Sequence, residues 1–167
     1  MTTKILVLSD SHASMQFMFR CVEKLKPDAI VHLGDYYDDA EALSEHYRRI
    51  PMHQVMGNND SGRAPIHARQ MLCYTVGGVM LFMVHGHNHN VYYGIEALVA
   101  DARKYGAQAA LYGHTHKPDC HYEPDGLLVL NPGSAGYGGR TAAIIKTDGE
   151  KITSAYFITE SDLEETV

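Results

Sequence analysis

The chain has 167 residues, of which 45% are hydrophobic and 20% charged, and this ordinary globular balance predicts a single domain over residues 1–167. Its formal net charge is −6 and its lysines and arginines are scattered, which argues against a long nucleic acid as a partner. A small anionic substrate is compatible with this charge, because bound metal cations would reverse the sign locally.

The first half of the chain predicts a β-α-β-α-β pattern with polar residues after each strand. The three strands and two helices alternate, and we expect them at residues 4–9, 15–25, 29–33, 38–49 and 52–56. Ser14 is a suitable N-cap for the first helix. The second helix has acids in its first turn and arginines in its last, as the helix dipole prefers, and should lie at the surface. Parallel strands with crossover helices follow from this order.

The second half begins with a predicted β-hairpin, whose strands at residues 71–76 and 79–84 flank the turn Gly77-Gly78. A helix over residues 92–105 and a short strand over residues 109–112 come next. The rest of the chain alternates apolar runs with Asp-Gly turns, which predicts an antiparallel second sheet.

The cysteines indicate a reducing compartment. Cys21, Cys73 and Cys120 are odd in number, far apart and without CxxC spacing, which argues against a disulfide framework and against a structural zinc site. The apolar run before Ser9 is too short for a signal-peptide core, and no apolar stretch is long enough to span a membrane. We therefore expect a cytoplasmic protein without a membrane partner.

Five polar clusters lie where predicted strands end, which is where open α/β sheets bind their ligands. The clusters are Asp10-Ser11-His12, Gly34-Asp35, Gly57-Asn58-Asn59-Asp60, His85-Gly86-His87 and Gly113-His114-Thr115-His116. The chain contains three His-x-His pairs, whereas random placement of its 11 histidines would give about 0.7. Residues two apart, such as Asp10 and His12, project to one side of an extended backbone and could close on a metal.

The donor atoms of these clusters suit transition metals. Carboxylate oxygens, imidazole nitrogens and a carboxamide oxygen fit Mn²⁺, Fe²⁺, Ni²⁺ or Zn²⁺ better than an all-oxygen calcium site. Two aspartates against two divalent cations leave the site cationic, so it can hold both hydroxide and a phosphate anion.

In their order along the chain, the motifs Asp-x-His, Gly-Asp, Gly-Asn-x-Asp, His and Gly-His-x-His resemble the calcineurin-like metallophosphoesterase superfamily. The resemblance covers residues 4–134 and is greatest to the small single-domain phosphodiesterases of bacteria and archaea. It implies an α/β fold of two facing mixed β-sheets flanked by helices, a four-layer αββα sandwich. Our reading of the residues alone reaches only the β-α-β-α-β half of that fold.

The resemblance also implies two divalent metal ions and seven ligands. One metal would be bound by Asp10, His12 and His116, the other by Asn58, His85 and His114, with Asp35 as the bridge between them. Mn²⁺ is the first choice of metal, with Ni²⁺, Fe²⁺, Zn²⁺ or Mg²⁺ as alternatives. The family further favours a homodimer or homotetramer.

The expected function is hydrolysis of a phosphate ester, first of all a phosphodiester, in a small phosphorylated substrate. Two metals about 3.5–4 Å apart lower the pKa of a shared water, and the hydroxide that bridges them attacks phosphorus in line. No protein nucleophile is needed. Phosphomonoesterase or nuclease activity is the alternative within this class.

The third cluster departs from the family, in which a histidine that protonates the leaving oxygen stands where this chain has Asn59. An amide cannot be a general acid. Without such an acid, the rate of hydrolysis falls by about 10²–10⁴-fold for a poor leaving group but much less for an activated one. We expect either that His87 partly replaces this acid or that the natural substrates have activated leaving groups. The catalytic candidates are therefore Asn59, His87 and Asp60.

Simpler interpretations exist for each candidate. Asp10 and Asp35 could cap helices, and Asn58 could be an ordinary turn residue. His87, Asn88 and His89 could lie in a solvated loop rather than near a substrate. Five other histidines are expected to be structural or exposed: His32, His46, His53, His67 and His121. The segment Asn131-Pro132-Gly133-Ser134 is expected to be a turn after a strand.

A different functional class is a non-catalytic metal-binding scaffold for protein interaction, as in the retromer subunit that resembles these small phosphoesterases. Such scaffolds usually lose ligand histidines. Every ligand position of this chain is filled, which favours the enzyme.

Overall fold

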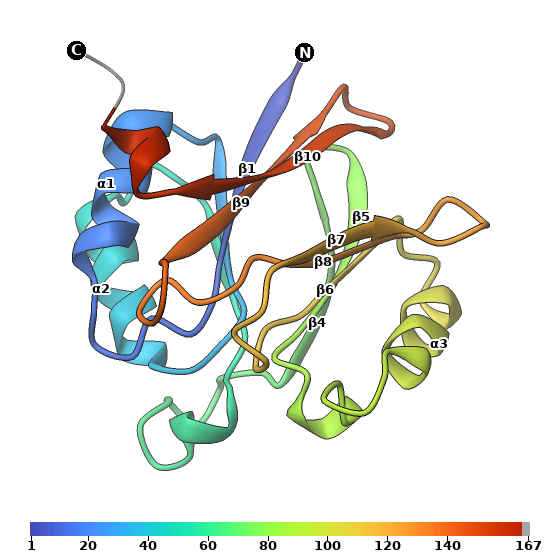
Figure 1. Cartoon of the computed structure of the whole chain (residues 1–167), viewed down its shortest axis with the longest axis horizontal. Coiled ribbons are helices and arrows are strands. Elements are labelled where there is room, and N and C mark those ends of the chain that lie inside the picture. The colour runs from blue at the N-terminus through green and yellow to red at the C-terminus, as the bar shows by residue number, and fades with distance from the viewer. Residues whose placement is uncertain (165–167) are drawn as a thin grey trace.

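Two five-stranded β-sheets face each other in the computed structural model, which describes residues 1–164 (Figure 1). The first sheet has the order β10-β9-β1-β2-β3. Its strands are β1 (Thr3–Leu8), β2 (Ala29–His32), β3 (Met52–Gln54), β9 (Thr141–Thr147) and β10 (Ile152–Thr159). Strands β1, β2 and β3 are parallel, as predicted, whereas β9 runs antiparallel to both β1 and β10.

The second sheet has the order β4-β5-β6-β8-β7. Its strands are β4 (Met71–Val76), β5 (Val79–Val84), β6 (Ala109–Leu111), β7 (Asp119–Tyr122) and β8 (Leu128–Asn131). The β4–β5 hairpin agrees with its predicted strands. Strand β6 lies parallel to both β5 and β8, so this sheet is mixed.

The expectation of an antiparallel second sheet was therefore wrong. The last two strands, β9 and β10, leave that sheet and extend the first one beside β1. Apolar runs and Asp-Gly turns predict strands and hairpins, but they do not say which distant strand becomes the partner, because that choice depends on long-range packing. The family resemblance predicted two facing mixed sheets, and this is confirmed.

Three α-helices cover the outer faces of the sheets and complete four layers (Figure 1). They are α1 (Gln16–Leu25), α2 (Tyr37–His46) and α3 (Glu96–Lys104); the short 3₁₀ helices are η1 (Asn58–Asp60), η2 (His87–His89) and η3 (Ser161–Leu163). Buried side chains of α1 and α2 pack with Leu6 and Leu8 of β1, and those of α3 pack with Phe82 of β5. Among the described residues, no helix is both long and apolar enough to cross a bilayer.

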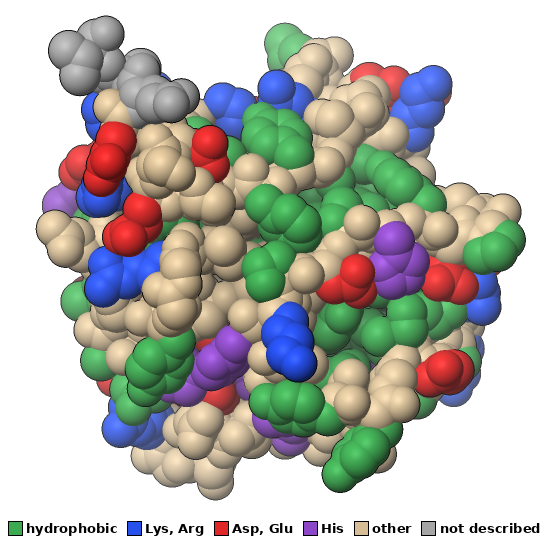
Figure 2. Space-filling view, in the orientation of Figure 1, with side chains coloured by type: hydrophobic (Ala, Val, Ile, Leu, Met, Phe, Trp, Pro, Cys, Tyr) green, Lys and Arg blue, Asp and Glu red, His purple; other side chains and the backbone are tan. Residues whose placement is uncertain are grey.

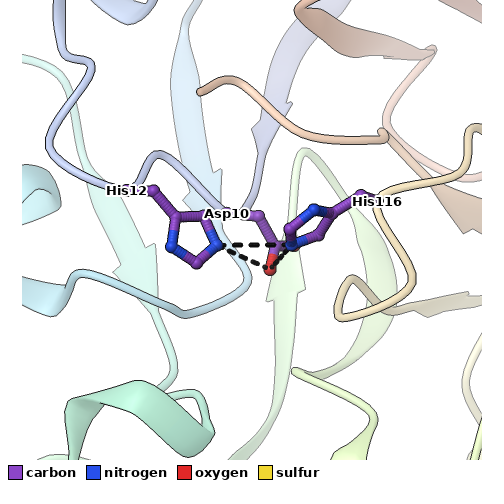
Figure 3. A group of neighbouring side chains, drawn as sticks. All are labelled: Asp10, His12 and His116. Carbon is purple, nitrogen blue, oxygen red and sulfur yellow. Dashed lines mark hydrogen bonds and ion pairs between the residues drawn. The ribbon is translucent and has the colours of Figure 1, made fainter. Parts of the chain in front are cut away.

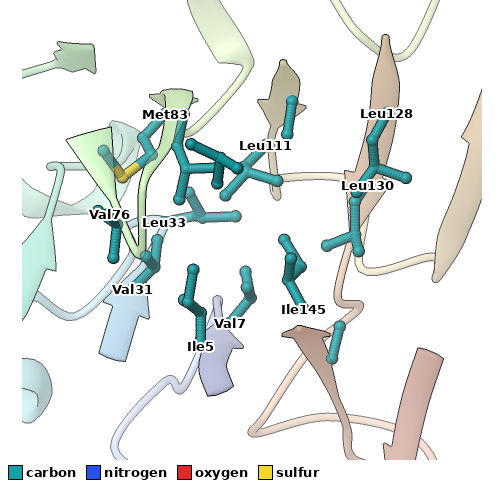
Figure 4. Close-up of a cluster of buried hydrophobic side chains, with 14 of the residues drawn as sticks. Ile5, Val7, Val31, Leu33, Val76, Met83, Leu111, Leu128, Leu130 and Ile145 are labelled. Atoms are coloured by element: carbon teal, nitrogen blue, oxygen red, sulfur yellow. The ribbon is translucent and has the colours of Figure 1, made fainter. Parts of the chain in front are cut away.

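Strand β1 shows why its sequence is apolar without alternation. Ile5 and Val7 point between the two sheets, while Leu6 and Leu8 point toward the helices, so both faces of the strand are buried. Figure 4 shows Ile5, Val7 and side chains from the facing sheet, Leu111 among them, gathered between the strands. This core holds the strand ends rigidly beneath the polar loops.

The helix ends differ from the predicted ones. Ser14 is not an N-cap: helix α1 starts at Gln16 without a side-chain cap, and the backbone N–H of Ser14 donates to Ser11 in the turn after β1. Helix α2 ends at His46, three residues early, because Tyr47, with φ −107° and ψ 53°, leaves the helical conformation and begins a turn. Helix α3 starts late because Gly94, with φ +145°, cannot be part of a helix.

His32, at the end of β2, is a fully buried histidine that supports the loops above it. The backbone N–H of Gly34 donates to its Nδ1 at 3.3 Å, so its proton lies on Nε2, which is 3.3 Å from Ser11 Oγ. Burial lowers the pKa of His32 from 6.5 to about 4. The ring is therefore neutral in the folded protein at neutral pH.

We expect His32 to make the stability of the metal-free protein depend on pH. The unfolded chain binds the proton first as the pH falls, so this stability is complete above pH 6.5 and is lost progressively toward pH 4. The difference corresponds to about 3 kcal/mol. Urea unfolding at pH 7 and pH 5 should show that the free energy of unfolding falls less between these pH values in His32→Gln than in the wild type. The control is His67→Gln, at an exposed histidine. An equal loss in all three proteins would contradict this role.

Candidate metal centre

The five polar clusters meet at one edge of the two sheets. Backbone bonds join their loops: the Asp10 N–H donates to the carbonyl of Gly34 at 2.9 Å, and the Gly113 N–H donates to that of His85 at 2.9 Å. The carboxyl ends of parallel strands in both sheets thus lead to the same place. The predicted site residues, scattered over more than 100 positions of the sequence, become neighbours here.

One group of potential ligands consists of Asp10, His12 and His116, as the resemblance implied. Oδ1 of Asp10 lies 3.1 Å from Nε2 of His116 and 3.7 Å from Nε2 of His12. The two imidazole nitrogens are 3.3 Å apart. Figure 3 shows both rings turned toward the carboxylate, His12 from the loop after β1 and His116 from the loop after β6.

The second group consists of Asp10, Asp35 and His85. Nε2 of His85 is 3.5 Å from Oδ1 of Asp35 and 3.8 Å from Oδ1 of Asp10. Oδ1 of Asn58 lies 3.1 Å from the same nitrogen. The other nitrogen of His85, Nδ1, donates to the carbonyl of Leu33 at 2.7 Å, which directs Nε2 into the site.

His114 lies at the border of the site. Its backbone N–H donates to Oδ2 of Asp10 at 3.1 Å, and its ring stands 5.0 Å from that of His85. In each of the two groups among the described residues, the ligand atoms lie within 4.8 Å of one another, and His114 belongs to neither group. The residue that the two groups share is Asp10, whereas Asp35 was the predicted bridge. All seven predicted ligands are nevertheless gathered around Asp10 and Asp35.

The ligand-bearing loops do not have the extended backbone that was expected. Asp10, His12, Asp35, His114 and His116 have φ between 45° and 68°, in the left-handed region. Residues other than glycine rarely adopt the left-handed conformation, which costs about 1–3 kcal/mol for each residue. Such residues are concentrated at functional sites, where the surrounding structure offsets this strain. Tight left-handed turns, rather than alternation along a strand, therefore aim these side chains at one point.

Two glycines allow the loops to approach one another. A Cβ at Gly57 would overlap the carboxylate of Asp35, and a Cβ at Gly113 would overlap Ser9 and the carboxylate of Asp10. Both positions can therefore hold only glycine without moving a predicted ligand.

Asp60 supports the site from below, and the structure corrects its assignment as a catalytic candidate. The residue is fully buried, and its carboxylate accepts N–H bonds from Asp35, Tyr37 and Gly57 at 2.7–3.0 Å. These bonds occupy the oxygens that a catalytic group would need. Asp60 thus positions the loops that carry Asp35 and Asn58.

Two residues beyond the predicted set hold the other loops. Asn131 Nδ2 donates to the Gly113 carbonyl and to Thr115 Oγ1, both at 3.0 Å, and Ser134 Oγ donates to the carbonyl of Asp10 at 2.8 Å. From the sequence, this Asn-Pro-Gly-Ser segment was expected first of all to be a turn after a strand, with a role at the site as the less favoured alternative. Its position directly after a buried strand was the signal that could have linked it to the other clusters.

Asp10 and Asp35 are buried together, and within residues 1–164 no lysine or arginine lies within 4.0 Å of either carboxylate. Burial raises the pKa of Asp10, but bonds from His116 and His12 outweigh it and hold that pKa well below its usual range. Burial also raises the pKa of Asp35, yet His85 and Asn59 lower it to about 2.

The histidines beside these carboxylates hold protons more tightly in the metal-free chain than free histidines do. Burial lowers the pKa of His85, but Asp35 and Asp10 outweigh burial and raise it. The bond to Asp10 raises the pKa of His116. Divalent cations would replace these protons, because histidine binds metals as the neutral ring and the carboxylates are already ionised. The donor set therefore fits divalent metal ions.

His87 and His89 differ in position. The ring of His87 lies 5.5 Å from that of His85 and 6.0 Å from that of His114, at the edge of the site. Burial lowers the pKa of His87, so its ring is neutral at pH 7 and only a small fraction can act as an acid. His89 instead bonds Asp101 of α3 at 2.9 Å.

Known proteins resemble this chain over most of its length. Residues 3–150 match the calcineurin-like phosphoesterase superfamily domain. A probable metallophosphoesterase of Mycoplasma pneumoniae is 29% identical over 136 residues, which is 79% of each chain.

Solved structures share the fold. A predicted phosphoesterase of Streptococcus pneumoniae TIGR4 has a TM-score of 0.71 at 24% identity, covering 96% of this chain and 99% of the other. Vps29 of Entamoeba histolytica, in a complex with Zn²⁺, has a TM-score of 0.72 at 18% identity, covering 93% and 97%. At such identities the likeness concerns the fold alone.

We expect divalent cations to stabilise the folded chain through this centre. A metal at 100 times its Kd adds about 2.7 kcal/mol, which for a chain of this size raises Tm by about 5–11 °C. Thermal unfolding of chelator-treated protein with added Mn²⁺, Ni²⁺, Zn²⁺ or Mg²⁺ measures this shift. Asp10→Asn should abolish it, whereas Asp38→Asn, at an exposed carboxylate, should keep it. A wild type that responds to none of these cations would contradict the site.

Proposed function

The chain belongs to the calcineurin-like phosphoesterase superfamily, and on that premise we propose that it is a metal-dependent phosphodiesterase acting on a small phosphorylated substrate. The observation that carries the proposal is the pair of buried carboxylates, Asp10 and Asp35, which no lysine or arginine of residues 1–164 balances. Four histidines around this pair, His12, His85, His114 and His116, offer the nitrogen donors that transition metals prefer. The family implies divalent metal binding.

The proposed ligand sets are those that the family resemblance implies. Asp10, His12 and His116 would hold one cation, Asn58, His85 and His114 would hold the second, and Asp35 would be shared. The first set coincides with one of the two groups of neighbouring ligand atoms, whereas the second adds Asn58 and His114 to the group that contains His85. Mn²⁺ is our first choice. Bound divalent cations supply Lewis acidity and make water acidic enough to ionise near neutral pH.

The two serine hydroxyl groups next to Asp10 are not free to attack a phosphate. Ser9 and Ser11 are both fully buried. Ser9 Oγ donates to Asp10, and Ser11 Oγ lies 3.3 Å from Nε2 of His32. Both groups hold the loops, which supports water rather than a serine as the nucleophile.

The arrangement around Asn59 supports substrates with good leaving groups. Its backbone N–H donates to Oδ1 of Asp35 at 3.0 Å, and its side-chain amide donates to Oδ2 at 2.7 Å. Asn59 thus holds the carboxylate and has no proton to transfer. His87, neutral at pH 7, is a weak replacement for the missing acid. Of the two expectations from the sequence, activated leaving groups are therefore the better supported.

The second candidate function is a metal-binding scaffold without turnover. The fold that the chain shares with Vps29 favours this alternative, since fold alone does not decide function. The filled ligand positions favour the enzyme. Phosphomonoester or nuclease activity would use the same centre with a differently shaped substrate.

Turnover tests the proposal. The Mn²⁺-loaded protein should hydrolyse bis(4-nitrophenyl) phosphate faster than 4-nitrophenyl phosphate, as followed by release of nitrophenolate. Asp35→Asn should lower the rate of hydrolysis at least about 10²-fold. The loss of a metal ligand should lower activity no less than the loss of a group that only orients a ligand. Asp38→Asn serves as the exposed control. A protein that retains metal but cleaves neither these esters nor cyclic nucleotides or pyrophosphates would support the scaffold instead.

The leaving group tests the roles of Asn59 and His87. Asn59→His should raise the rate on an alkyl phosphodiester by up to about 10²-fold and change the rate on the aryl diester little, since only a poor leaving group needs an acid. His87→Ala should change the two rates by the same factor. A selective loss on the alkyl diester in His87→Ala would show that His87 is the acid after all.

A further inference from the structure

Tyrosine rings surround the candidate metal centre at the surface. The ring of Tyr137 lies 4.7 Å from that of His12 and 5.7 Å from that of His116, and the Tyr36 ring lies 5.1 Å from His12. In the lower part of Figure 2, histidine side chains at the surface have hydrophobic side chains, a class that includes tyrosine, on both sides. Two of the candidate ligands, His12 and His116, thus have tyrosine rings beside them, and we define Tyr36 and Tyr137 as the aromatic rim.

Packing alone does not account for the rim. Tyr137 is 56% exposed, so most of its ring remains free after it has contacted the two histidines. Tyr36 has φ +66°, which is a strained backbone for a bulky residue. Its neighbours fix this conformation, since the N–H groups of Asp35 and Tyr37 on either side donate to Asp60. Strain held in place beside a site is typical of a functional residue.

A cation belongs to the same rim. The guanidinium carbon of Arg63 lies 4.5 Å above the ring of Tyr36. Arg63 is exposed, and within residues 1–164 no carboxylate lies within 4.0 Å of its guanidinium. A guanidinium stacked on an aromatic ring offers a second flat face and a positive charge to a ligand.

We propose that the rim of Tyr36 and Tyr137, with Arg63, binds a planar aromatic ring on an ester group of the substrate. The inference rests on the proposed function and narrows its substrate class to phosphate esters that carry an aryl ring or a nucleobase. The rings next to His12 and His116 place such a group beside the phosphorus that the metal centre holds. Tyrosine faces stack on flat rings largely irrespective of their substituents.

Binding of non-hydrolysable probes tests the rim apart from turnover. Calorimetry on the Mn²⁺-loaded protein should give a Kd for phenylphosphonate at least about 5-fold below that for methylphosphonate, the gain expected from one stacked ring. The 5′-methylenephosphonate analogues of AMP and of ribose 5-phosphate, in which carbon replaces the ester oxygen, are the corresponding pair for a nucleobase. If the protein prefers the ring-bearing probe in the first pair but not in the second, the rim binds aryl groups. If it prefers the ring-bearing probe in both pairs, the rim binds nucleobases as well. Absence of preference in both pairs overturns the proposal.

Variants assign the preference to the rim. Tyr137→Leu and Arg63→Met should each reduce the preference for the aromatic probe, while Tyr122→Leu, at an equally exposed tyrosine on β7, should not. Tyr137→Leu should raise KM for bis(4-nitrophenyl) phosphate at least about 5-fold with kcat within about 2-fold. Bound metal, measured in each variant, must equal that of the wild type, since a tyrosine that only packs the histidines would lower it. Equal weakening of both phosphonates in Tyr137→Leu overturns the proposal.

The two proposals fail in different ways. If the wild type cleaves no ester but binds the aromatic probes more tightly, the rim stands and the phosphodiesterase proposal falls. If it cleaves phosphodiesters but Tyr137→Leu keeps the full preference, the phosphodiesterase stands and the rim falls.

Discussion

Asp10 and Asp35 lie buried beside each other at the point where the two sheets open, and their charges need a partner that the chain does not supply as lysine or arginine. An unbalanced buried charge is among the most expensive features a fold can contain. Histidine protons meet part of this need in the metal-free chain, because the neighbouring carboxylates raise the pKa of His85 and His116. Divalent cations meet it better, because each brings two charges and accepts several donors at once. Electrostatics within the fold therefore favours the binding of cations at this site.

The architecture serves this centre in several places. Parallel strands in both sheets end at the same edge, and the chain crosses from the second sheet back to the first directly above Asp10. That crossing brings Ser134 to the carbonyl of Asp10, while Asp60 ties the loop after β2 to the loop after β3. Where the ligand-bearing loops meet, bonds from buried polar side chains to the backbone thus hold the loops together. The left-handed residues among the ligands can persist because these bonds over-determine the loops.

The same fold occurs in a predicted phosphoesterase and in Vps29, so the side chains of the site, and not the fold, must distinguish a hydrolase from a scaffold. The filled ligand positions point to the hydrolase. In the proposed phosphodiesterase, the bonds from Asn59 to both oxygens of Asp35 would favour substrates with good leaving groups, because Asn59 would orient a ligand where the family resemblance implies an acid. The aromatic rim beside His12 is consistent with the same preference for activated, ring-bearing esters.

The sequence by itself determined the order of the strands along the chain, the position of the β4–β5 hairpin and the seven residues that gather at the site. Apolar runs, turn residues and strand-end clusters are local signals, and they survive in the structure because burial and turn chemistry act over a few residues. Only the tertiary structure decided that β9 pairs with β1, that Asp60 is a buried support of the loops, and that Tyr36 and Tyr137 lie beside the candidate ligand His12. These outcomes depend on contacts between residues far apart in the chain. No local pattern records such contacts, because each is selected by the packing of the whole core around it.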